Sequence, residues 1–440
     1  MKAGWTARVA AAAAFSLALS GCFSGSEADD TTGSSEGSGE SGETVSLRLA
    51  HGWTGEVPQA RAFEPAVERF QEEHPEIDLT VETAAGNEIK TLVSSDMAAG
   101  REPDVFLHWG TRDTSPYIED DRLADLTDYL DENPEIRDRY EEGAFDSVTW
   151  DGRVYGLPIG AYAQVLLIND AVMDAAGVEP PQDEADVLRA VEELVAADVI
   201  PFAVNGTAER YLFELFLARE LGADGLDAVA TGDPATRDAI TSAAAQVMEL
   251  RDAGAFPEGA ETLQTLQALE LYNSGAAAMF YNETWTIGNL TDEVIETTTL
   301  STYPGADVRT LAGAGYYVYI SADAWADEER RAAALELAEY LAGPEVNTDL
   351  VEISWYPSPM VDDELDVDTS ALPALVQDML QTRADAVASG EFADKLDEKL
   401  TAGAFESLTS LAERLFIGEL TPEQFADALL DATAADPARL

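Results

Sequence analysis

The length, composition and charge of this chain argue against several classes of protein. Its 440 residues suffice for two or three domains, and 46% hydrophobic with 25% charged residues is ordinary for a folded protein, which disfavours wholesale disorder and a coiled-coil rod. The 25 Lys and Arg residues face 85 Asp and Glu residues, so the net charge is −60, and lysine occurs only at positions 2, 90, 395 and 399. Such a field repels phosphate backbones and anionic lipids, so no nucleic-acid partner is expected and we interpret the acidity as a solvating surface.

The first residues have the pattern of an export signal. Lys2 and Arg8 precede an apolar run over residues 9–19, which is too short to span a bilayer comfortably. The next motif is Leu19-Ser20-Gly21-Cys22, and Cys22 is the only cysteine in the sequence. It resembles the lipobox of bacterial lipoproteins, which implies a signal peptide over residues 1–21 and acylation of Cys22. We therefore expect the chain outside the cytoplasm, lipid-anchored to the outer face of the bacterial cell membrane.

Residues 22–43 are expected to form a tether. After Cys22 this stretch is rich in Ser, Gly, Asp and Glu and contains no basic residue, a composition typical of a flexible, self-repelling linker. Because no cysteine remains for a disulfide, the stability of the folded part must come from large hydrophobic cores.

Strand and helix patterns alternate along the rest of the chain. The first block predicts strands over residues 45–49, 77–81 and 104–107 and helices over 63–70 and about 88–99, which is a β-α-β arrangement with a parallel sheet. A second block predicts a strand over 165–168, a helix over 187–195 and extended structure over 201–204, followed later by a strand over 316–320 and a helix over 330–341. Two lobes are therefore indicated, and the remainder is expected to be mostly helical.

Two tryptophans follow the predicted strands of the first block. His51-Gly52-Trp53 follows the first strand and His108-Trp109-Gly110 the third. Ligands of open α/β sheets bind beyond the carboxyl ends of the strands, so both indoles are expected at one rim. For either Trp alone, plugging the edge of the lobe is an equally good interpretation.

Familiar catalytic and cofactor motifs are absent from the sequence. The glycine-rich cradles for phosphates and dinucleotides do not occur, and three His residues without a cysteine in the body exclude zinc sites of familiar spacing. Asp366-Val367-Asp368 begins like a calcium loop but lacks its glycine and its final glutamate. We predict no cofactor and no metal. A glycosidase needs only two well-placed carboxylates, so hydrolysis stays open at this point.

Several short motifs occur in order along the chain. They span residues 98–105 (AAGREPDV), 123–126 (LADL), 151–158 (DGRVYGLP), 168–170 (IND), 272–279 (YNSGAAAM) with Trp285, and 418–423 (GELTPE). From about Val45 to the C-terminus the chain resembles the extracellular solute-binding lipoproteins of bacterial ABC importers, in the carbohydrate-binding branch that includes maltose-binding protein. The sequence departs from that pattern at Pro181–Asp186 and at Asn282-Glu283-Thr284, and the second departure touches the site, so the substrate stays open.

The resemblance implies a two-lobed α/β fold of the type II periplasmic-binding-protein kind. Each lobe would be a mixed, mostly parallel sheet flanked by helices, with a hinge cleft between them. The N-terminal lobe is expected over residues 44–158 plus 308–350, and the C-terminal lobe over 159–307 plus 351–440.

A sugar presents an apolar face and a ring of hydroxyls, so its site needs aromatic platforms and hydrogen-bonding groups. In the first lobe we expect Trp53 and Trp109 as platforms, Glu56 and Asp113 as acceptors, and His51 as a polar neighbour. By the same resemblance, the rest of the site would comprise Tyr162, Tyr211, Glu283, Trp285, Gly313 and Trp355.

The predicted function is capture of a sugar or oligosaccharide and its delivery to the transmembrane subunits of an ABC permease, by a monomer that is not an enzyme. One alternative keeps the fold but binds a polyamine or another polar solute, because aromatic walls and carboxylates also suit ammonium groups. The other is a secreted glycoside-cleaving enzyme or a sugar sensor without transport.

Overall fold

The computed structural model describes residues 44–206, 208–222, 225–305 and 308–439. The predicted signal peptide, Cys22 and the linker lie outside these residues. Within them, no helix is both long enough and apolar enough to cross a bilayer.

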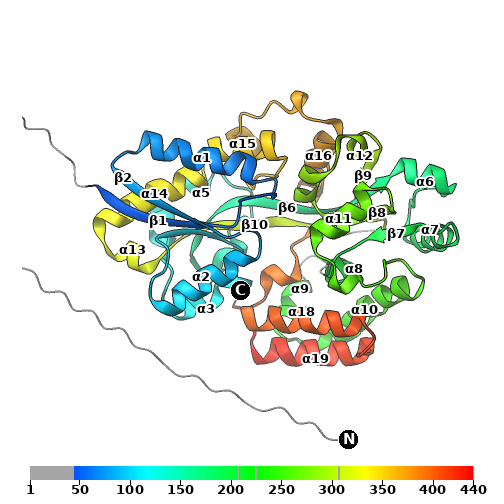
Figure 1. Cartoon of the computed structure of the whole chain (residues 1–440). Helices are drawn as coiled ribbons and strands as arrows, with labels where there is room; N and C mark the ends of the chain where they lie inside the picture. Colours follow the sequence, from blue (N-terminus) through cyan, green and yellow to red (C-terminus); the bar gives the residue numbers. More distant parts are fainter. Residues whose placement is uncertain (1–43, 207, 223–224, 306–307, 440) are drawn as a thin grey trace, which may run out of the picture. The chain divides into compact units, whose positions relative to one another are not determined.

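One path of hydrogen-bonded strands runs through the described part of the chain, in the order β2-β1-β3-β10-β6-β8-β7, with β11 beside β10 and β9 beside β6 (Figure 1). The strands are β1 (Val45–His51), β2 (Ile77–Thr83), β3 (Val105–His108), β6 (Gly156–Asn169), β7 (Ile200–Ala203), β8 (Ala277–Glu283), β9 (Thr298–Ser301), β10 (Thr310–Ile320) and β11 (Phe392–Ala393). A separate ribbon pairs β4 (Thr149–Trp150) with β5 (Arg153–Val154). β1 is parallel to β2 and β3, and β7 to β8, whereas β10 and β6 are antiparallel to each other.

Helices flank this sheet throughout (Figure 1). Up to residue 252 they are α1 (Ala60–Glu73), α2 (Glu88–Ala99), α3 (Thr111–Glu119), α4 (Thr127–Glu132), α5 (Pro134–Arg137), α6 (Asp170–Ala176), α7 (Glu184–Ala196), α8 (Ala208–Leu221), α9 (Leu226–Ala230) and α10 (Arg237–Asp252). The later ones are α11 (Thr265–Asn273), α12 (Asp292–Glu296), α13 (Ala322–Ala326), α14 (Glu328–Leu341), α15 (Pro344–Ser354), α16 (Ala374–Ser389), α17 (Leu396–Lys399), α18 (Ala402–Phe416) and α19 (Pro422–Ala435). The mixed α/β architecture predicted from the sequence is confirmed.

Three hydrophobic clusters form the core. The first takes its buried side chains from residues 47–159 and 314–360, and the second and third take theirs from 165–311 and 351–430. Along β6, Val165 and Leu167 belong to the third cluster while Leu166 and Ile168 belong to the second, because successive strand side chains point to opposite faces. We call the part that packs on the first cluster the first half and the part that packs on the other two the second half. The exact lobe boundaries stay a prediction.

The two halves share β6 and β10. β10 pairs with β3 through residues 317–320 and with β6 along residues 312–319, with a register irregularity around Tyr316. At Gly160 of β6, a Cβ atom would lie only 2.4 Å from the ring of Tyr356, so only glycine lets this ring pack against the strand. A third connection between the halves follows α15, where Trp355 takes a left-handed conformation with φ of 55°.

Candidate functional site

The two tryptophans predicted at one rim lie beyond neighbouring parallel strands, β1 and β3. Tyr316 of β10 lies between them. Its ring stacks on Trp53 with centroids 4.9 Å apart and meets Trp109 edge-on, also at 4.9 Å. Trp53 is only 5% exposed, since Phe63 and Tyr356 also meet its ring in T-shaped contacts, and it belongs to the first core. Trp109 is half-buried at the border of the same core.

A lysine from α2 occupies the space beside Trp109. The Nζ of Lys90 lies 4.4 Å from the centroid of the Trp109 ring and 2.7 Å from Oδ1 of Asp113. Trp109 and Asp113, which the sequence assigned to one half of the site, are therefore joined through the ammonium group of Lys90.

A second lysine joins the residues predicted from the second half. The Nζ of Lys395 lies 2.7 Å from Oε1 of Glu283 and 4.1 Å from the centroid of the Tyr162 ring. Tyr211 is also near this ammonium, at 5.5 Å from its ring centroid. The indole Nε1 of Trp285 donates to the other oxygen of Glu283 at 3.2 Å. Trp285 follows β8 of the second half, yet it packs against the core of the first half.

The short helix α17 connects these two groups. Its Leu396 lies in the second core, while its acidic residues face Arg112 of α3 in the first half. Arg112 Nη1 lies 2.5 Å from Asp397 and 2.9 Å from Glu398, and its Nε lies 3.3 Å from Asp113. Lys395 lies 3.3 Å from Glu398. A continuous series of contacts therefore runs from Trp109 in the first half to Trp285 in the second.

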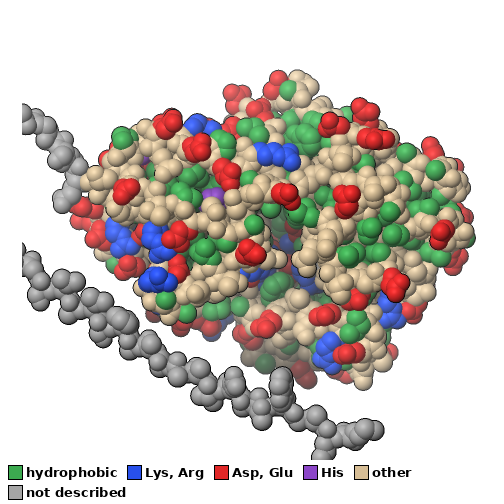
Figure 2. Space-filling view, in the orientation of Figure 1, with side chains coloured by type: hydrophobic (Ala, Val, Ile, Leu, Met, Phe, Trp, Pro, Cys, Tyr) green, Lys and Arg blue, Asp and Glu red, His purple; other side chains and the backbone are tan. Residues whose placement is uncertain are grey.

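Two further residues of α8 complete this ion cluster. Arg210 Nη1 lies 2.5 Å from Asp397 and 2.5 Å from Glu214. We call the resulting cluster the central network; it comprises Lys90, Arg112, Asp113, Arg210, Glu214, Glu283, Lys395, Asp397 and Glu398. Figure 2 shows a hollow between the two halves in which basic and acidic side chains are visible. Most of the network is deeply buried, and the Lys90 side chain is its most exposed member at 31%.

Burial and neighbouring charges set the protonation of the network. Burial opposes ionisation of Asp397, yet Arg112 and the other cations hold its pKa well below the usual range. Burial, with Asp397 close by, raises the pKa of Glu398 to about 7, although Arg112 counteracts this. Burial likewise raises the pKa of Glu214 to about 7. The network thus holds firmly ionised carboxylates beside others that bind a proton near neutral pH.

The remaining predicted site residues lie outside the central network or at its edge. His51 is buried against Phe63, and burial lowers its pKa to about 4, so it is neutral at pH 7. Glu56 is exposed, and its backbone carbonyl accepts a hydrogen bond from Asn289. Trp355 packs against the third core.

Gly313 of β10 lies beside the network. A Cβ atom there would come within 2.5 Å of Asp394 Oδ1 and 3.1 Å of the Tyr162 hydroxyl, so the strand passes these side chains closely. The structure thus brings together Trp109, Asp113, Tyr162, Tyr211, Glu283, Trp285 and Gly313. Trp53 reaches Trp109 only through the ring of Tyr316, and His51, Glu56 and Trp355 lie apart. Their roles toward a ligand stay predictions.

Sequence reasoning missed most of the charged members of the network. The missed residues are Lys90, Arg112, Arg210, Glu214, Lys395, Asp397 and Glu398. One usable signal was the scarcity of lysine, since three of its four positions lie in or next to this cluster.

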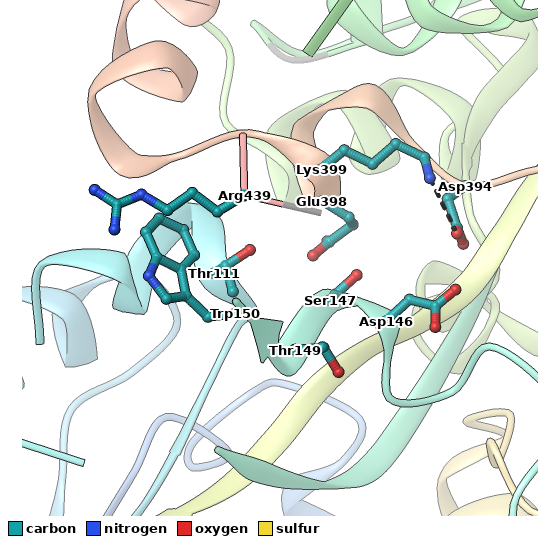
Figure 3. Close-up of a pocket in the computed structure, with 9 residues that line it drawn as sticks. All are labelled: Thr111, Asp146, Ser147, Thr149, Trp150, Asp394, Glu398, Lys399 and Arg439. Carbon is teal, nitrogen blue, oxygen red and sulfur yellow. Dashed lines mark ion pairs between the residues drawn. The ribbon is translucent and has the colours of Figure 1, made fainter. Parts of the chain in front are cut away.

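A small cavity of about 30 Å³ lies on another side of α17 (Figure 3). It is lined by Thr111, Asp146, Ser147, Thr149, Trp150, Asp394, Glu398, Lys399 and Arg439. Figure 3 shows the Glu398 carboxylate near the hydroxyl groups of Thr111 and Ser147, with Lys399 paired to Asp394. Burial raises the pKa of Asp394 to about 6. A wider hollow of about 510 Å³ borders α16 and β11. Neither cavity is lined by the predicted aromatic residues.

One group of side chains has the composition of a metal site. His74 Nδ1 lies 3.2 Å from Glu336 and 3.4 Å from Glu76, and the imidazole stacks on Phe70. Both glutamates are at least 49% exposed, and exposed acidic groups are common beside a histidine without a metal.

Comparison with known proteins places the chain among transport proteins. A family model described as bacterial extracellular solute-binding protein matches residues 65–377. An uncharacterised ABC transporter extracellular-binding protein of Pyrococcus horikoshii is 24% identical over 336 residues, which cover 73% of this chain and 74% of that protein. A xylose/arabinose-binding protein of Haloferax volcanii is 25% identical over 261 residues, covering 57% of this chain and 56% of that protein.

Solved structures share the fold. A chitin oligosaccharide binding protein superposes with a TM-score of 0.75 and 21% identity, covering 89% of this chain and 99% of that one. A maltose/maltodextrin-binding domain of Bdellovibrio bacteriovorus, bound to maltotriose, gives a TM-score of 0.70 and 17% identity, covering 89% and 99%. These matches confirm the fold class predicted from the sequence.

Proposed function

Since the chain belongs to the bacterial extracellular solute-binding proteins of ABC transporters, we propose that it captures a sugar or oligosaccharide between its two halves and delivers it to a membrane permease. The observation that carries this proposal is the series of contacts from Trp109 to Trp285. It links two half-buried indoles to tyrosines and carboxylates, and a sugar needs this combination of flat apolar surfaces and hydrogen-bonding groups. The names of the Haloferax relative and of the structural neighbours support a saccharide as the ligand.

Transport by this route breaks no bond in the ligand. A ligand that contacts both halves would favour the arrangement in which they approach, because it binds that arrangement more tightly than the open one. The permease would recognise the closed form, and its ATPase subunits would supply the energy. The protein would therefore act as a binding component and not as an enzyme.

The polyamine alternative is less well supported than a sugar. Lys90 and Lys395 already place ammonium groups against the aromatic rings and carboxylates that would attract a cationic ligand. Arg112 and Arg210 add positive charge a few ångströms away. A polyamine would have to displace or approach these four cations, at an electrostatic cost.

A thermal-shift screen over mono- and oligosaccharides, followed by calorimetry, tests the proposal. A sugar that binds only the folded protein raises its melting temperature. We expect at least one saccharide to do so and putrescine and spermidine to have no effect. If no saccharide shifts the melting temperature and a polyamine does, the function proposed here is wrong.

We also propose that Cys22 carries a lipid, that residues 1–21 are removed, and that the body is tethered by residues 22–43. Metabolic labelling with a fatty acid tests this. The full-length protein should incorporate label and stay in the membrane fraction, whereas Cys22→Ser should do neither. Equal labelling of both proteins would contradict the assignment. The tethered protein is expected to be a monomer, which light scattering of the released body can check.

A further inference from the structure

Lys90 differs from the other cations of the central network in its surroundings. Its side chain is 31% exposed, whereas Arg112, Arg210 and Lys395 are at most 7% exposed. Among the described residues, Lys90 forms a salt bridge with Asp113 alone. Lys395, in contrast, has three carboxylates within 3.8 Å, namely Glu283, Asp397 and Glu398.

The charge of Lys90 is under-compensated by its neighbours. Burial lowers its pKa, and Arg112 acts in the same direction, so the pairing with Asp113 does not fully offset them. For Lys395 the pKa is instead raised, because three carboxylates outweigh the effect of burial. A further negative group beside Lys90 would therefore be favourable, while one beside Lys395 would find its cation already satisfied.

The balance of positive and negative charges in the central network differs from that of the acidic protein as a whole. It holds four cations against five carboxylates, and burial raises the pKa of both Glu214 and Glu398 to about 7. Near pH 7 these two carboxyl groups are partly protonated, so the net charge of the network is close to zero. The whole chain, in contrast, has a net charge of −60. Blue side chains are visible in the hollow in Figure 2. An anionic group entering this hollow meets far less repulsion than elsewhere on the acidic surface.

The position of Lys90 also fits a ligand contact. Its ammonium lies over the face of Trp109, where a sugar ring would stack. A lysine carries a compact charge on a flexible stem, so it can leave the indole and reach a group at the edge of a stacked ring. The cation–π contact that is lost would be replaced by a charge-assisted hydrogen bond if that group is anionic.

From these observations we propose that the ligand is a sugar acid, a saccharide that carries a carboxylate, and that Lys90 binds this carboxylate beside Trp109. The inference rests on the proposed function and specifies the substrate class of the same site. Lys90 is then a specificity-determining residue that separates acidic from neutral sugars.

Calorimetry with matched ligands tests this inference. D-glucuronate is compared with D-glucose, D-galacturonate with D-galactose, and digalacturonate with its neutral disaccharide counterpart. We expect the acids to bind more tightly than their neutral partners and their affinity to fall with added NaCl. Lys90→Met should weaken binding of the acids by about 10- to 100-fold, the range of a lost hydrogen bond to a charged group, and should weaken binding of the neutral sugars by a clearly smaller factor.

Two further variants keep the test decisive. Lys90→Arg retains the charge and should recover much of the affinity for the acids. Arg101→Met removes an exposed cation just after α2 and should change nothing, which controls for the altered net charge. Melting curves of all three variants confirm that they are folded.

Other outcomes separate the two proposals. Neutral sugars that bind as tightly as the acids, or a Lys90→Met variant that weakens both kinds equally, would overturn the sugar-acid inference and leave the sugar-binding function intact. Absence of binding by any saccharide in the wider screen would overturn both.

Discussion

Removal of Arg112 is the most informative test of the contact between the two halves. Its guanidinium pairs with Asp397 and Glu398, whose side chains are fully buried. In Arg112→Met, Asp397 keeps Arg210 at 2.5 Å, but Glu398 keeps only Lys395 at 3.3 Å, and its oxygens accept no hydrogen bond from the described residues. Glu398 is therefore the carboxylate that loses most of its compensating positive charge.

Breaking a buried ion pair by removing one partner costs about 3–5 kcal/mol, because the other charge stays buried without compensation. For a chain of this length the entropy of unfolding is about 0.9 kcal/mol per kelvin, so this cost corresponds to a fall of about 3–6 °C in melting temperature. The fall in melting temperature should be largest at pH 8, where Glu398 is ionised. At pH 5.5 the carboxyl group is protonated, so the loss should be clearly smaller.

Differential scanning calorimetry of the unsubstituted protein and the variant at both pH values gives the measurement. Arg189→Met is the matched control, since Arg189 also pairs with two carboxylates but on the exposed surface of α7, and its melting temperature should stay nearly unchanged. The double variant Arg112→Met with Glu398→Gln should recover part of the loss at pH 8, because it removes the uncompensated charge. An equal loss at both pH values, or a loss below 1 °C at pH 8, would refute this account of the buried pair.

Three further predictions concern the same region. Stability should fall as the pH rises from about 4.5 to about 7, because folded Glu398 and Glu214 each retain a proton that the unfolded chain releases; Glu398→Gln should make this slope shallower in urea titrations without removing it. Trp285→Ala should weaken ligand binding by about 10- to 100-fold in calorimetry while the unliganded protein stays folded, and unchanged affinity would remove Trp285 from the site. Gly160→Ala should destabilise the protein by about 1–3 kcal/mol in urea unfolding, because its Cβ would meet the Tyr356 ring; a neutral result would show that the ring moves aside easily.

The sequence predicted the secondary structure best where local chemistry determines it. Helix α2 ends where predicted, because Gly100 takes the left-handed conformation that terminates a helix. The strand predicted over 165–168 was too short, since β6 begins at Gly156. Its first part is rich in glycine and alanine and lacks the apolar alternation that marks a strand, and its pairing with β10 comes from residues about 150 positions away.

Of the charged residues in the central network, the sequence pointed only to Asp113 and Glu283. Trp109 and Trp285 were singled out because one follows a strand end and the other follows an ordered motif, and their role toward a ligand stays a prediction. The bond between Arg112 and Asp397 spans 285 positions, and nothing local distinguishes Asp397 from the other acidic residues. Trp53 was expected as a platform or as a plug at the edge of the lobe, and nothing in the sequence indicated that Tyr316 of the distant strand β10 stacks on it.

In the described part of the chain lysine is confined to the central network and its edge, which has a practical consequence for biosensor work. Among the described residues, Lys90 has the most exposed of the three amine-bearing side chains, ahead of Lys399 and Lys395. Immobilisation or dye coupling through the side-chain amines of these residues would therefore modify first the group that lies over Trp109. A protein attached in this way would report weak binding or none, whereas capture through an affinity tag would leave that side chain untouched.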